Sequence, residues 1–344
     1  MSLYRPVKIG SLQLPGNLFL APLAGYTERA FRSICTEQGA NLGFTELISA
    51  EALYRNPAHY GLGNQTDAEA AVPAAINLIS RGENEKHYGI QLFAGNPQAI
   101  YKAALLLAPL KPDVLDINSC CPVTKVVKNG AGAALMREPA ILGKVVEAAV
   151  QASRERLGGI PVTIKILSGW DFGAINYAEC ARIAVEAGAA MVSLHPRTRS
   201  QMYEGKSNWA YIADLVTRIS VPVAGSGDLY TPQDAQRMLK ETSCAAIMFA
   251  RGCMGNPFIF SAARSQLTEG KWEAASFPAR IAIAMRHLEQ LAVYIGERSA
   301  CLEMRKQFCA YTKGLTGGAA LREKLVHAAT IAEYQRIIGG FNPA

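Results

Sequence analysis

The sequence contains no Cys-x-x-Cys pair, although eight cysteines are present among its 344 residues. They are scattered through apolar segments, which argues against a disulfide framework and favours a reducing compartment. No stretch of about eighteen uncharged apolar residues occurs, so we expect no membrane span. Residues 1–16 carry Arg5, Lys8 and two prolines where a signal peptide needs an apolar core. These absences together predict a soluble protein of the cytoplasm.

Acidic residues are fewer than basic ones. The chain has 28 Asp and Glu against 35 Lys and Arg, which gives a formal net charge of +7. This moderate excess permits an anionic partner without requiring one. Half of the residues are apolar, and the chain exceeds the length at which a single core comfortably grows. We therefore expect one large domain with a smaller one attached, and a monomer is the default.

Short apolar runs recur through the first 255 residues, and each is followed by an amphipathic segment. The runs lie at 17–21, 42–47, 88–93, 113–117, 161–166, 189–195, 221–224 and 245–250. Helices are predicted at 27–38, 97–108, 139–157, 177–187, 209–219 and 232–241. Continuous apolar runs are typical of strands buried on both faces, and their alternation with helices predicts right-handed βαβ units. Eight such strands predict an α/β fold of the (β/α)8 TIM-barrel type, whose chemistry gathers at the carboxyl ends of the strands.

A doubly wound sheet is the alternative fold. It would need a glycine-rich fingerprint after the first strand, where the sequence has Ala21-Pro22-Leu23-Ala24-Gly25 instead. The long connection at 49–86 is typical of a lid or decoration over the active face, although it carries no recognisable chemistry.

After Asn256 the pattern changes to long amphipathic helices without strands. One apolar face includes Ile281, Met285 and Leu288, and further helices are predicted at 300–314, 319–329 and 332–338. The chain is therefore expected to divide into a barrel domain at 1–256 and a smaller C-terminal helical bundle domain at 257–344. The bundle holds eleven Lys and Arg against seven Asp and Glu, so it carries +4 of the net +7. A basic surface for a partner is expected there.

The stretch Asp116-Ile117-Asn118-Ser119-Cys120-Cys121-Pro122 stands at the end of the fourth predicted strand. The strand delivers polar side chains and two thiols into a loop that proline keeps from continuing as a helix. This arrangement is typical of a reactive site. The alternative is a structural turn with buried, inert cysteines.

Small or polar residues end every predicted strand, and in a barrel these ends face one another. They are Pro22-Leu23-Ala24, Glu46, Gln91, Asn118 with Cys121, Lys165, His195 with Arg197 and Arg199, Ser226-Gly227-Asp228 and Ala250-Arg251-Gly252. Lys165 is embedded in an apolar strand, so it needs an anionic or polar partner. His195 also ends an apolar strand, although a hydrogen-bonded core histidine is the alternative there.

Taken in order, these segments resemble the tRNA-dihydrouridine synthases, flavin-dependent enzymes that reduce uridine in tRNA, and most of all their bacterial B-type branch. The resemblance runs from Asn17 to beyond Lys313. It rests on residues 21–32, 116–122, 165, 195–205, 208–209, 225–228 and 251–257. Each piece alone is weak, and their order and spacing carry the resemblance. The chain departs from the family at Cys120, Pro196 and Ser226, where the family usually has glycine, glycine and asparagine.

The resemblance implies that the barrel mouth binds FMN. Its ring would be contacted by Pro22, Leu23, Ala24, Gln91, Lys165 and His195. A cation such as Lys165 stabilises negative charge on the reduced ring. The phosphate would lie after the seventh and eighth strands, where barrels commonly bind one. The residues there are Ser226, Gly227, Asp228, Ala250 and Arg251. No metal is expected.

In the mechanism that the resemblance implies, a nicotinamide cofactor, NADPH or else NADH, reduces the FMN. Reduced FMN passes hydride to C6 of uracil while the Cys121 thiol protonates C5. A thiol pKa near the ordinary value of about 8.5 suits an acid that must start protonated. Cys120 is a competing thiol, and the position before proline favours Cys121. Asn118 is expected to hold the uracil edge.

The resemblance also implies that the target uridine leaves the tRNA stack to reach the barrel mouth. Arg197 and Arg199 are expected to grip phosphates around it, and Arg305 and Lys306 to face RNA from the helical domain. Ordinary solvated basic surfaces would look the same. Two other functions stay open, a flavin barrel that reduces a free pyrimidine or other small molecule, and a non-catalytic RNA-binding protein. The intact Cys121 argues against the second.

Overall fold

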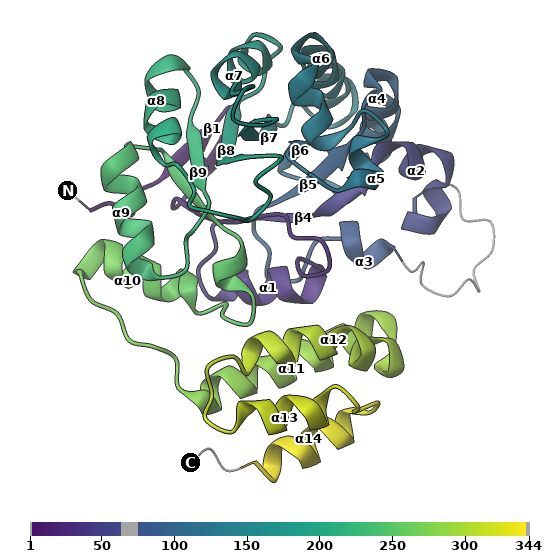
Figure 1. The fold of residues 1–344 in the computed structure, drawn as a ribbon. Coiled ribbons are helices and arrows are strands. Elements are labelled where there is room, and N and C mark those ends of the chain that lie inside the picture. Colours follow the sequence, from purple (N-terminus) through teal and green to yellow (C-terminus); the bar gives the residue numbers. More distant parts are fainter. Residues whose placement is uncertain (1, 63–74, 342–344) are drawn as a thin grey trace.

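Residues 2–62 and 75–341 are described in the structure, a computed structural model of the chain. Eight parallel strands close into a barrel in the order β10-β3-β4-β5-β6-β7-β8-β9 (Figure 1). They are β3 (Leu18–Leu20), β4 (Leu42–Ser49), β5 (Tyr88–Phe93), β6 (Val114–Ser119), β7 (Val162–Gly169), β8 (Met191–Thr198), β9 (Val223–Ser226) and β10 (Ala246–Phe249). Each strand overlaps the apolar run that predicted it, so the TIM-barrel prediction is confirmed.

Helices cover the outside of the barrel and connect successive strands (Figure 1). They are α1 (Arg29–Glu37), α2 (Ala50–Arg55), α3 (Ile76–Ile79), α4 (Pro97–Leu106), α5 (Thr124–Val127), α6 (Pro139–Arg156), α7 (Tyr177–Glu186), α8 (Ala210–Arg218), α9 (Pro232–Thr242) and α10 (Ile259–Glu269). Proline begins α4, α6 and α9, a position where its missing N–H leaves no helical hydrogen bond unmade. All six helices predicted between the strands are present. The connection at 49–86 contains α2 and α3, and its residues 63–74 lie outside the described part of the chain.

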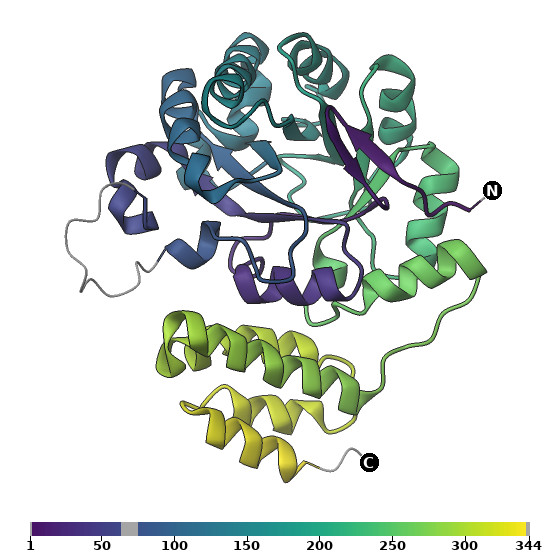
Figure 2. The same cartoon turned by 180° about the vertical axis from the view of Figure 1, so that it is seen from behind.

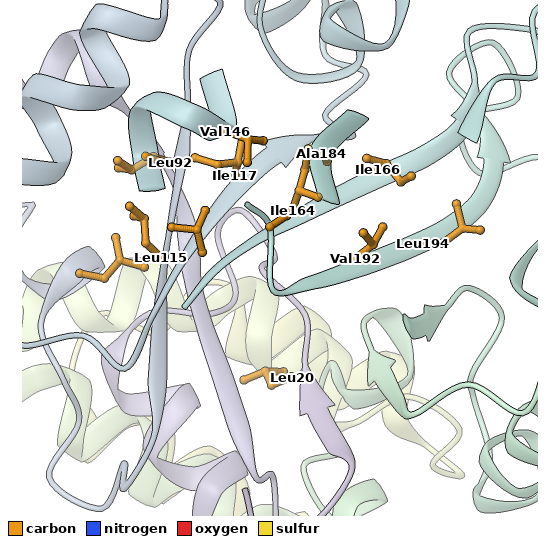
Figure 3. Packing of buried hydrophobic residues seen from close by; sticks show 14 of the residues in the cluster. Leu20, Leu92, Leu115, Ile117, Val146, Ile164, Ile166, Ala184, Val192 and Leu194 are labelled. Atoms are coloured by element: carbon orange, nitrogen blue, oxygen red, sulfur yellow. The ribbon is translucent and has the colours of Figure 1, made fainter. Parts of the chain in front are cut away.

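Side chains along each strand alternate between the helical shell and the barrel interior. Ile164 and Ile166 of β7 belong to one buried cluster with Val146 of α6 and Ala184 of α7 (Figure 3). The residues between and before them therefore face the interior, and one of these is Lys165. This alternation places polar side chains inside the upper barrel without disturbing the apolar layer around it.

A hairpin that the sequence did not predict precedes the barrel. Its strands, β1 (Val7–Ile9) and β2 (Leu12–Leu14), pair antiparallel with Val7 opposite Leu14. Val7, Ile9 and Leu14 are buried in one cluster with Met191 and Ala246, the first residues of β8 and β10. The hairpin therefore closes the barrel interior at the amino ends of the strands, opposite the expected active face.

Four further helices follow an extended segment and lie beneath α1 as a separate layer (Figures 1 and 2). They are α11 (Phe277–Ile295), α12 (Glu297–Tyr311), α13 (Gly318–Leu325) and α14 (Ile331–Gly339). Their core contains Leu288, Met304 and Phe308, and it includes Ala30 and Ile34 from α1 of the barrel. One barrel helix thus forms a wall of the second core.

The position of the domain boundary follows from the packing of α10. Its residues Ile259, Phe260 and Ala263 belong to the barrel cluster, whereas the core of the helical layer draws on α11 and later helices. The sequence predicts the domain boundary after residue 256. The packing of α10 on the barrel favours a later boundary, and we propose that it lies between α10 and α11, at residues 270–276.

Glu28, His287 and Tyr311 form a buried polar group where α1 meets α11 and α12. The Glu28 carboxylate caps α1 by accepting hydrogen bonds from the N–H groups of Ala30 and Phe31, at 2.6 and 2.8 Å. Its Oε1 also lies 2.7 Å from His287 Nε2, and the Tyr311 hydroxyl lies 3.3 Å from His287 Nδ1. Burial by itself raises the pKa of Glu28, but the His287 charge and the hydrogen bonds outweigh it, so this pKa is lowered.

All eight cysteines are free thiols. Over residues 2–62 and 75–341, no helix is both long and apolar enough to cross a bilayer. Within the same ranges, no three His, Cys, Asp or Glu side chains are grouped as ligands for a metal ion.

Candidate active site

A cavity of about 440 Å³ opens at the carboxyl ends of the barrel strands, within the size range of small-ligand sites. Twelve of the predicted residues line it: Pro22, Leu23, Ala24, Asn118, Cys121, Lys165, His195, Ser226, Gly227, Asp228, Ala250 and Arg251. The predicted Gln91, Arg197, Arg199, Arg305 and Lys306 do not line it. The barrel therefore unites most of the expected site, although these residues span more than two hundred positions of sequence.

Neighbouring strands bring four polar side chains into a hydrogen-bonded chain inside the barrel. In the strand register, Gln91 of β5 lies beside Asp116 of β6, and Asn118 lies beside Lys165 of β7. Thr163 Oγ1 donates to Asp116 Oδ1 at 2.5 Å, and Gln91 Nε2 donates to Asp116 Oδ2 at 2.7 Å. Asn118 Nδ2 donates in turn to Gln91 Oε1 at 2.8 Å. Gln91 thus binds Asp116 and Asn118 beneath the cavity and is not among the residues that line it.

This series of hydrogen-bonded side chains ends at the loop that carries Cys120 and Cys121, here called the thiol loop. Asn118 Oδ1 accepts hydrogen bonds from the N–H groups of Cys120 and Cys121, at 3.1 and 2.9 Å. Asp116 lies at its centre, and burial raises the pKa of this carboxyl to about 6, against the hydrogen bonds from Thr163 and Gln91. The Asn118 side chain therefore fixes the loop that carries the thiols.

The two adjacent thiols have different surroundings. Cys121 is 9% exposed and packs with Val126 and Ala131 in a small apolar cluster. Cys120 Sγ accepts a hydrogen bond from Lys165 Nζ at 3.5 Å. Burial raises the pKa of both thiols, and the Lys165 charge acts in the opposite direction on both, as the second-largest cause for Cys120 and the smallest for Cys121. Both thiols line the cavity, so both can reach a bound molecule.

Lys165 and His195 bring nitrogen atoms to the cavity from the neighbouring strands β7 and β8. Lys165 is 8% exposed, and its ammonium group donates to Cys120 Sγ and lies close enough to Asp116 for its charge to act on the pKa of that carboxyl. His195 Nε2 is buried without a hydrogen-bond partner among the described residues. Burial, followed by the charges of Lys165, Arg197 and Arg251, holds the pKa of His195 well below its usual range. The imidazole is therefore neutral, with a polar atom that requires a partner.

Asp228 organises the loop that follows β9. Its carboxylate lies 2.8 Å from Arg197 Nη2 and 3.2 Å from Arg251 Nη2, and it accepts a hydrogen bond from Ser207 N at 2.8 Å. Arg197 is 1% exposed and also donates to the carbonyls of Glu204 and Gly205. The expectation that Arg197 grips phosphate on the surface therefore does not match its position. It is buried behind the cavity wall, where Asp228 and two carbonyls bind its Nε and Nη2, while its Nη1 is buried without a partner among the described residues.

Two glycines bring backbone close to the end of the cavity that lies after β9 and β10. Gly227 has a φ of +101°, and a Cβ there would collide with Ser207 Oγ and press on His195 Nδ1. A Cβ on Gly252 would collide with the carbonyl oxygen of Leu229. A side chain is therefore excluded at both positions, which leaves peptide groups and the Arg251 guanidinium facing the cavity.

The remaining predicted basic residues lie outside the cavity. Arg199 follows β8 at the rim, where its guanidinium carbon lies 4.9 Å from the Trp170 ring centroid. Arg305 and Lys306 belong to α12 of the helical layer. Lys306 Nζ donates to Glu303 at 3.0 Å and lies 5.8 Å from the Tyr26 ring centroid, which places it at the barrel edge.

Several lining residues were not predicted for the site. They are Ala21, Leu47, Cys120, Pro122, Val123, Val126, Leu167, Thr198, Met202, Tyr203, Leu229 and Tyr230. Met202, Tyr203 and Tyr230 are exposed although they are large and apolar or aromatic. Their place directly after β8 and β9 was the available signal, because loops at the carboxyl ends of barrel strands form the mouth.

Three comparisons with known proteins agree with this architecture. The sequence profile described as dihydrouridine synthase (Dus) matches residues 19–338. A probable tRNA-dihydrouridine synthase of Treponema pallidum (strain Nichols) is 45% identical over 342 residues, which cover 98% of this chain and 96% of that one. The tRNA-dihydrouridine synthase B of Pseudomonas aeruginosa is 31% identical over 317 residues, covering 92% and 90%.

Solved structures share the fold at low sequence identity. An old yellow enzyme homologue from Zymomonas mobilis superposes with a TM-score of 0.52 at 14% identity, covering 81% of this chain and 96% of that one. A histamine dehydrogenase from Rhizobium sp. 4-9 gives a TM-score of 0.55 at 15% identity, covering 83% of this chain and 50% of that one. At such identities the likeness concerns the barrel alone.

Proposed function

The chain belongs to the dihydrouridine synthase family, and from this premise we propose that it reduces uridines of tRNA to 5,6-dihydrouridine, with FMN in the barrel mouth and NADPH, or else NADH, as reductant. One observation supports this most directly. The cavity brings a protonated thiol, a buried ammonium group and a neutral imidazole with an unpartnered nitrogen to one place.

The residues present fit FMN. Lys165 is a buried cation that needs a polar partner, and His195 Nε2 lacks one among the described residues. The polar edge of an isoalloxazine ring would satisfy both. Gly227, Gly252 and the Arg251 guanidinium would receive the phosphate, as barrels commonly do after their last two strands. When bound, FMN supplies the reducing equivalent for the 5,6 double bond of uracil.

Cys121 is the proposed general acid. Its pKa is raised by burial, so the thiol holds its proton at neutral pH. The Sγ–H bond breaks as the proton passes to C5 of uracil, and the resulting thiolate regains a proton from water. The Asn118 hydrogen bonds to the backbone of Cys120 and Cys121 hold the loop in the position from which this transfer occurs.

Asn118 has limited capacity to bind uracil directly. Its Oδ1 already accepts two hydrogen bonds, and one of its Nδ2 protons is donated to Gln91. One amide proton remains for a uracil carbonyl. We therefore assign to Asn118 one hydrogen bond to the substrate, in addition to its role in fixing the thiol loop.

Basic residues of both domains support tRNA as the substrate. Arg199 at the barrel rim is exposed in part, and Arg305 and Lys306 lie on α12. Residues 257–344 carry eleven Lys and Arg against seven Asp and Glu. Cationic side chains on both sides of the mouth would bind the RNA backbone while the extruded base enters the cavity.

The experiment that tests this function has two parts. The purified protein is expected to show flavin absorbance, and to convert uridine to dihydrouridine when given NADPH and tRNA from cells that lack this gene. Free uridine serves as the control substrate. A protein that stays colourless after incubation with FMN contradicts the flavin assignment, and reduction of free uridine with tRNA left unchanged contradicts the RNA substrate.

A further inference from the structure

Two stacks of arginine and aromatic side chains stand on the rim of the cavity. In one, the Arg251 guanidinium carbon lies 4.9 Å from the Tyr203 ring centroid and 5.4 Å from that of Tyr230. This stack belongs to the cavity wall, because all three residues line it. The second stack lies outside the cavity, and neither the proposed catalysis nor the flavin site accounts for it.

The second stack consists of Arg137, Trp170 and Arg199. The guanidinium carbons lie 4.8 and 4.9 Å from the Trp170 ring centroid, so both arginines pack on one indole. The three residues follow β6, β7 and β8, and all belong to the active face of the barrel. Arg199 N donates to Gly169 O, and Ser200 N donates to Trp170 O, both at 3.0 Å. These two hydrogen bonds therefore join the turn at Trp170 to the residues that follow β8.

Both arginines lack a carboxylate partner. Among the residues that the structure describes, neither Arg137 nor Arg199 forms an ion pair or donates a side-chain hydrogen bond, and Arg199 Nε is buried without an acceptor. Glu138 and Asp171 are the acidic residues next to the stack in sequence. Asp171 Oδ1 accepts instead from Gly173 N at 2.9 Å. Two guanidinium groups on one ring without a counter-charge favour an anion with more than one charged group.

Phe172 projects beside this stack. Its side chain is 73% exposed. The turn that carries it is fixed by hydrogen bonds from Ala174 N to Asp171 O at 3.1 Å and from Trp170 N to Ala174 O at 3.2 Å. A solvent-facing aromatic ring carried on a hydrogen-bonded turn, next to cations without a counter-charge, is a combination that binds unpaired nucleotides, since bases stack on the ring while the cations bind the phosphates.

We propose that Arg137, Trp170, Phe172 and Arg199 form a rim clamp for single-stranded RNA. The two guanidinium groups hold phosphates of the unpaired strand, and Phe172 stacks on a base that flanks the extruded uridine. Thr198 lines the cavity and Arg199 follows it directly, so the clamp begins one residue from the cavity wall. This inference rests on the proposed function and adds to it the place where the RNA strand next to the target is held.

The test compares rim variants with matched controls in binding to unmodified tRNA over a range of salt concentrations. The variants are Phe172→Ala, Arg137→Gln and Arg199→Gln. Val293→Ala on α11 is the apolar control, and Arg182→Gln, which is exposed on α7 and pairs with Glu186, is the basic control. Phe172→Ala is expected to weaken binding about tenfold, as loss of one stacked base does. Each arginine variant is expected to lower the slope of log Kd against log salt by about one.

The outcomes separate the clamp from the proposed function. Flavin content and NADPH oxidation without RNA are expected to be unchanged in the rim variants, because none of the three residues lines the cavity. If the wild-type protein reduces tRNA and the rim variants bind it as well as Val293→Ala and Arg182→Gln do, the clamp is wrong and the function stands. If tRNA binding is unchanged and Phe172→Ala alters the sedimentation of the protein, the patch is a protein interface. If the wild type does not bind tRNA, the clamp and the RNA substrate are both wrong.

Discussion

Single residues decide the chemistry of the thiol loop. Cys120 and Cys121 are adjacent, yet only Cys120 contacts the Lys165 ammonium group, whereas Cys121 packs among apolar side chains. An ammonium group favours the thiolate, and an apolar environment favours the protonated thiol. The pKa of both thiols is raised by burial, so both are protonated at rest, and we propose Cys121 as the donor because Cys120 is engaged by Lys165.

The first prediction compares the two thiols. Cys121→Ala is expected to lower the rate of dihydrouridine formation by on the order of a hundredfold or more, the usual contribution of a general acid, while flavin content and NADPH oxidation persist. Cys120→Ala is expected to stay within a fewfold of wild type. Rates are measured in single turnover with pre-reduced flavin, so that delivery of electrons from NADPH does not limit them. The reverse ranking would assign the acid to Cys120.

The sequence identified the residues of the site better than their contacts. It located Lys165, His195 and Cys121 because polar residues that end apolar strands stand out against their surroundings. It could not show that Arg197 is buried against Asp228, 31 positions away, since that pairing depends on how two loops fold over each other. It also could not show that Gln91 binds Asp116 and Asn118, because partners on adjacent strands depend on register.

At the scale of secondary-structure elements, salt bridges join the carboxyl ends of three neighbouring strands. The buried ion pair between Arg197 and Asp228 joins the end of β8 to the loop after β9, and the second bond from Asp228 to Arg251 joins both to the end of β10. Three neighbouring strand ends are thus held together by one carboxylate. Removal of Arg197 leaves Asp228 with Arg251 and the Ser207 N–H, but the Glu204 and Gly205 carbonyls lose their donor and the loop loses its link to β8.

The second prediction concerns this junction. Arg197→Ala is expected to lower the free energy of unfolding by about 3 kcal/mol, read from the midpoint of urea denaturation, and to weaken FMN binding because the loop after β9 loses its anchor. Arg199→Ala, two residues further on, is the control. It should leave the midpoint nearly unchanged and weaken tRNA binding instead. A stable Arg197→Ala protein that retains FMN but has lost tRNA affinity would restore a direct RNA role to Arg197.

Regular elements were predicted more reliably than short or irregular ones. β5 begins and ends at the predicted residues, Tyr88 and Phe93, because its mostly apolar run lies between Lys86-His87 and the turn residues Gly95-Asn96-Pro97. The strands of the β1–β2 hairpin have three residues each, too few for any periodic pattern to stand out. α10 continues directly from the last barrel loop, so its sequence resembles the helical layer although it packs on the barrel.

At the scale of the whole molecule, the barrel and the helical layer meet at a buried polar contact. Glu28 caps a barrel helix and pairs with His287 of the other layer, so a single carboxylate stabilises both. Phe31 stacks on the His287 ring with centroids 5.5 Å apart, which excludes water from the pair. Any RNA surface that spans both layers depends on this contact for its geometry.

The third prediction follows from the lowered pKa of Glu28. A carboxyl group whose pKa is lower in the folded state contributes its stability fully above the unfolded value of about 4.3, and this contribution is lost as pH falls through the folded value. Glu28→Gln is expected to reduce the unfolding free energy by about 3 kcal/mol at pH 7. Its stability should then fall less steeply than that of wild type in acid. The measurement is urea denaturation at a series of pH values.

Glu186→Gln provides the matched control for this measurement. Glu186 is exposed on α7, and its pairing with Arg182 is expected to contribute little to stability. This variant should follow the wild-type pH profile. If Glu28→Gln also follows it without loss of stability, the contact between the layers depends on apolar packing rather than on the ion pair.

The hydrogen-bonded chain from Thr163 through Asp116 and Gln91 to Asn118 has a consequence for how this enzyme can evolve. Each member satisfies the next, so a substitution at one position leaves a buried group unmatched unless another position changes with it. Changes that are harmful singly can be tolerated in pairs, which is sign epistasis. Grafting the thiol loop onto another barrel would therefore require that these four residues be grafted together with it.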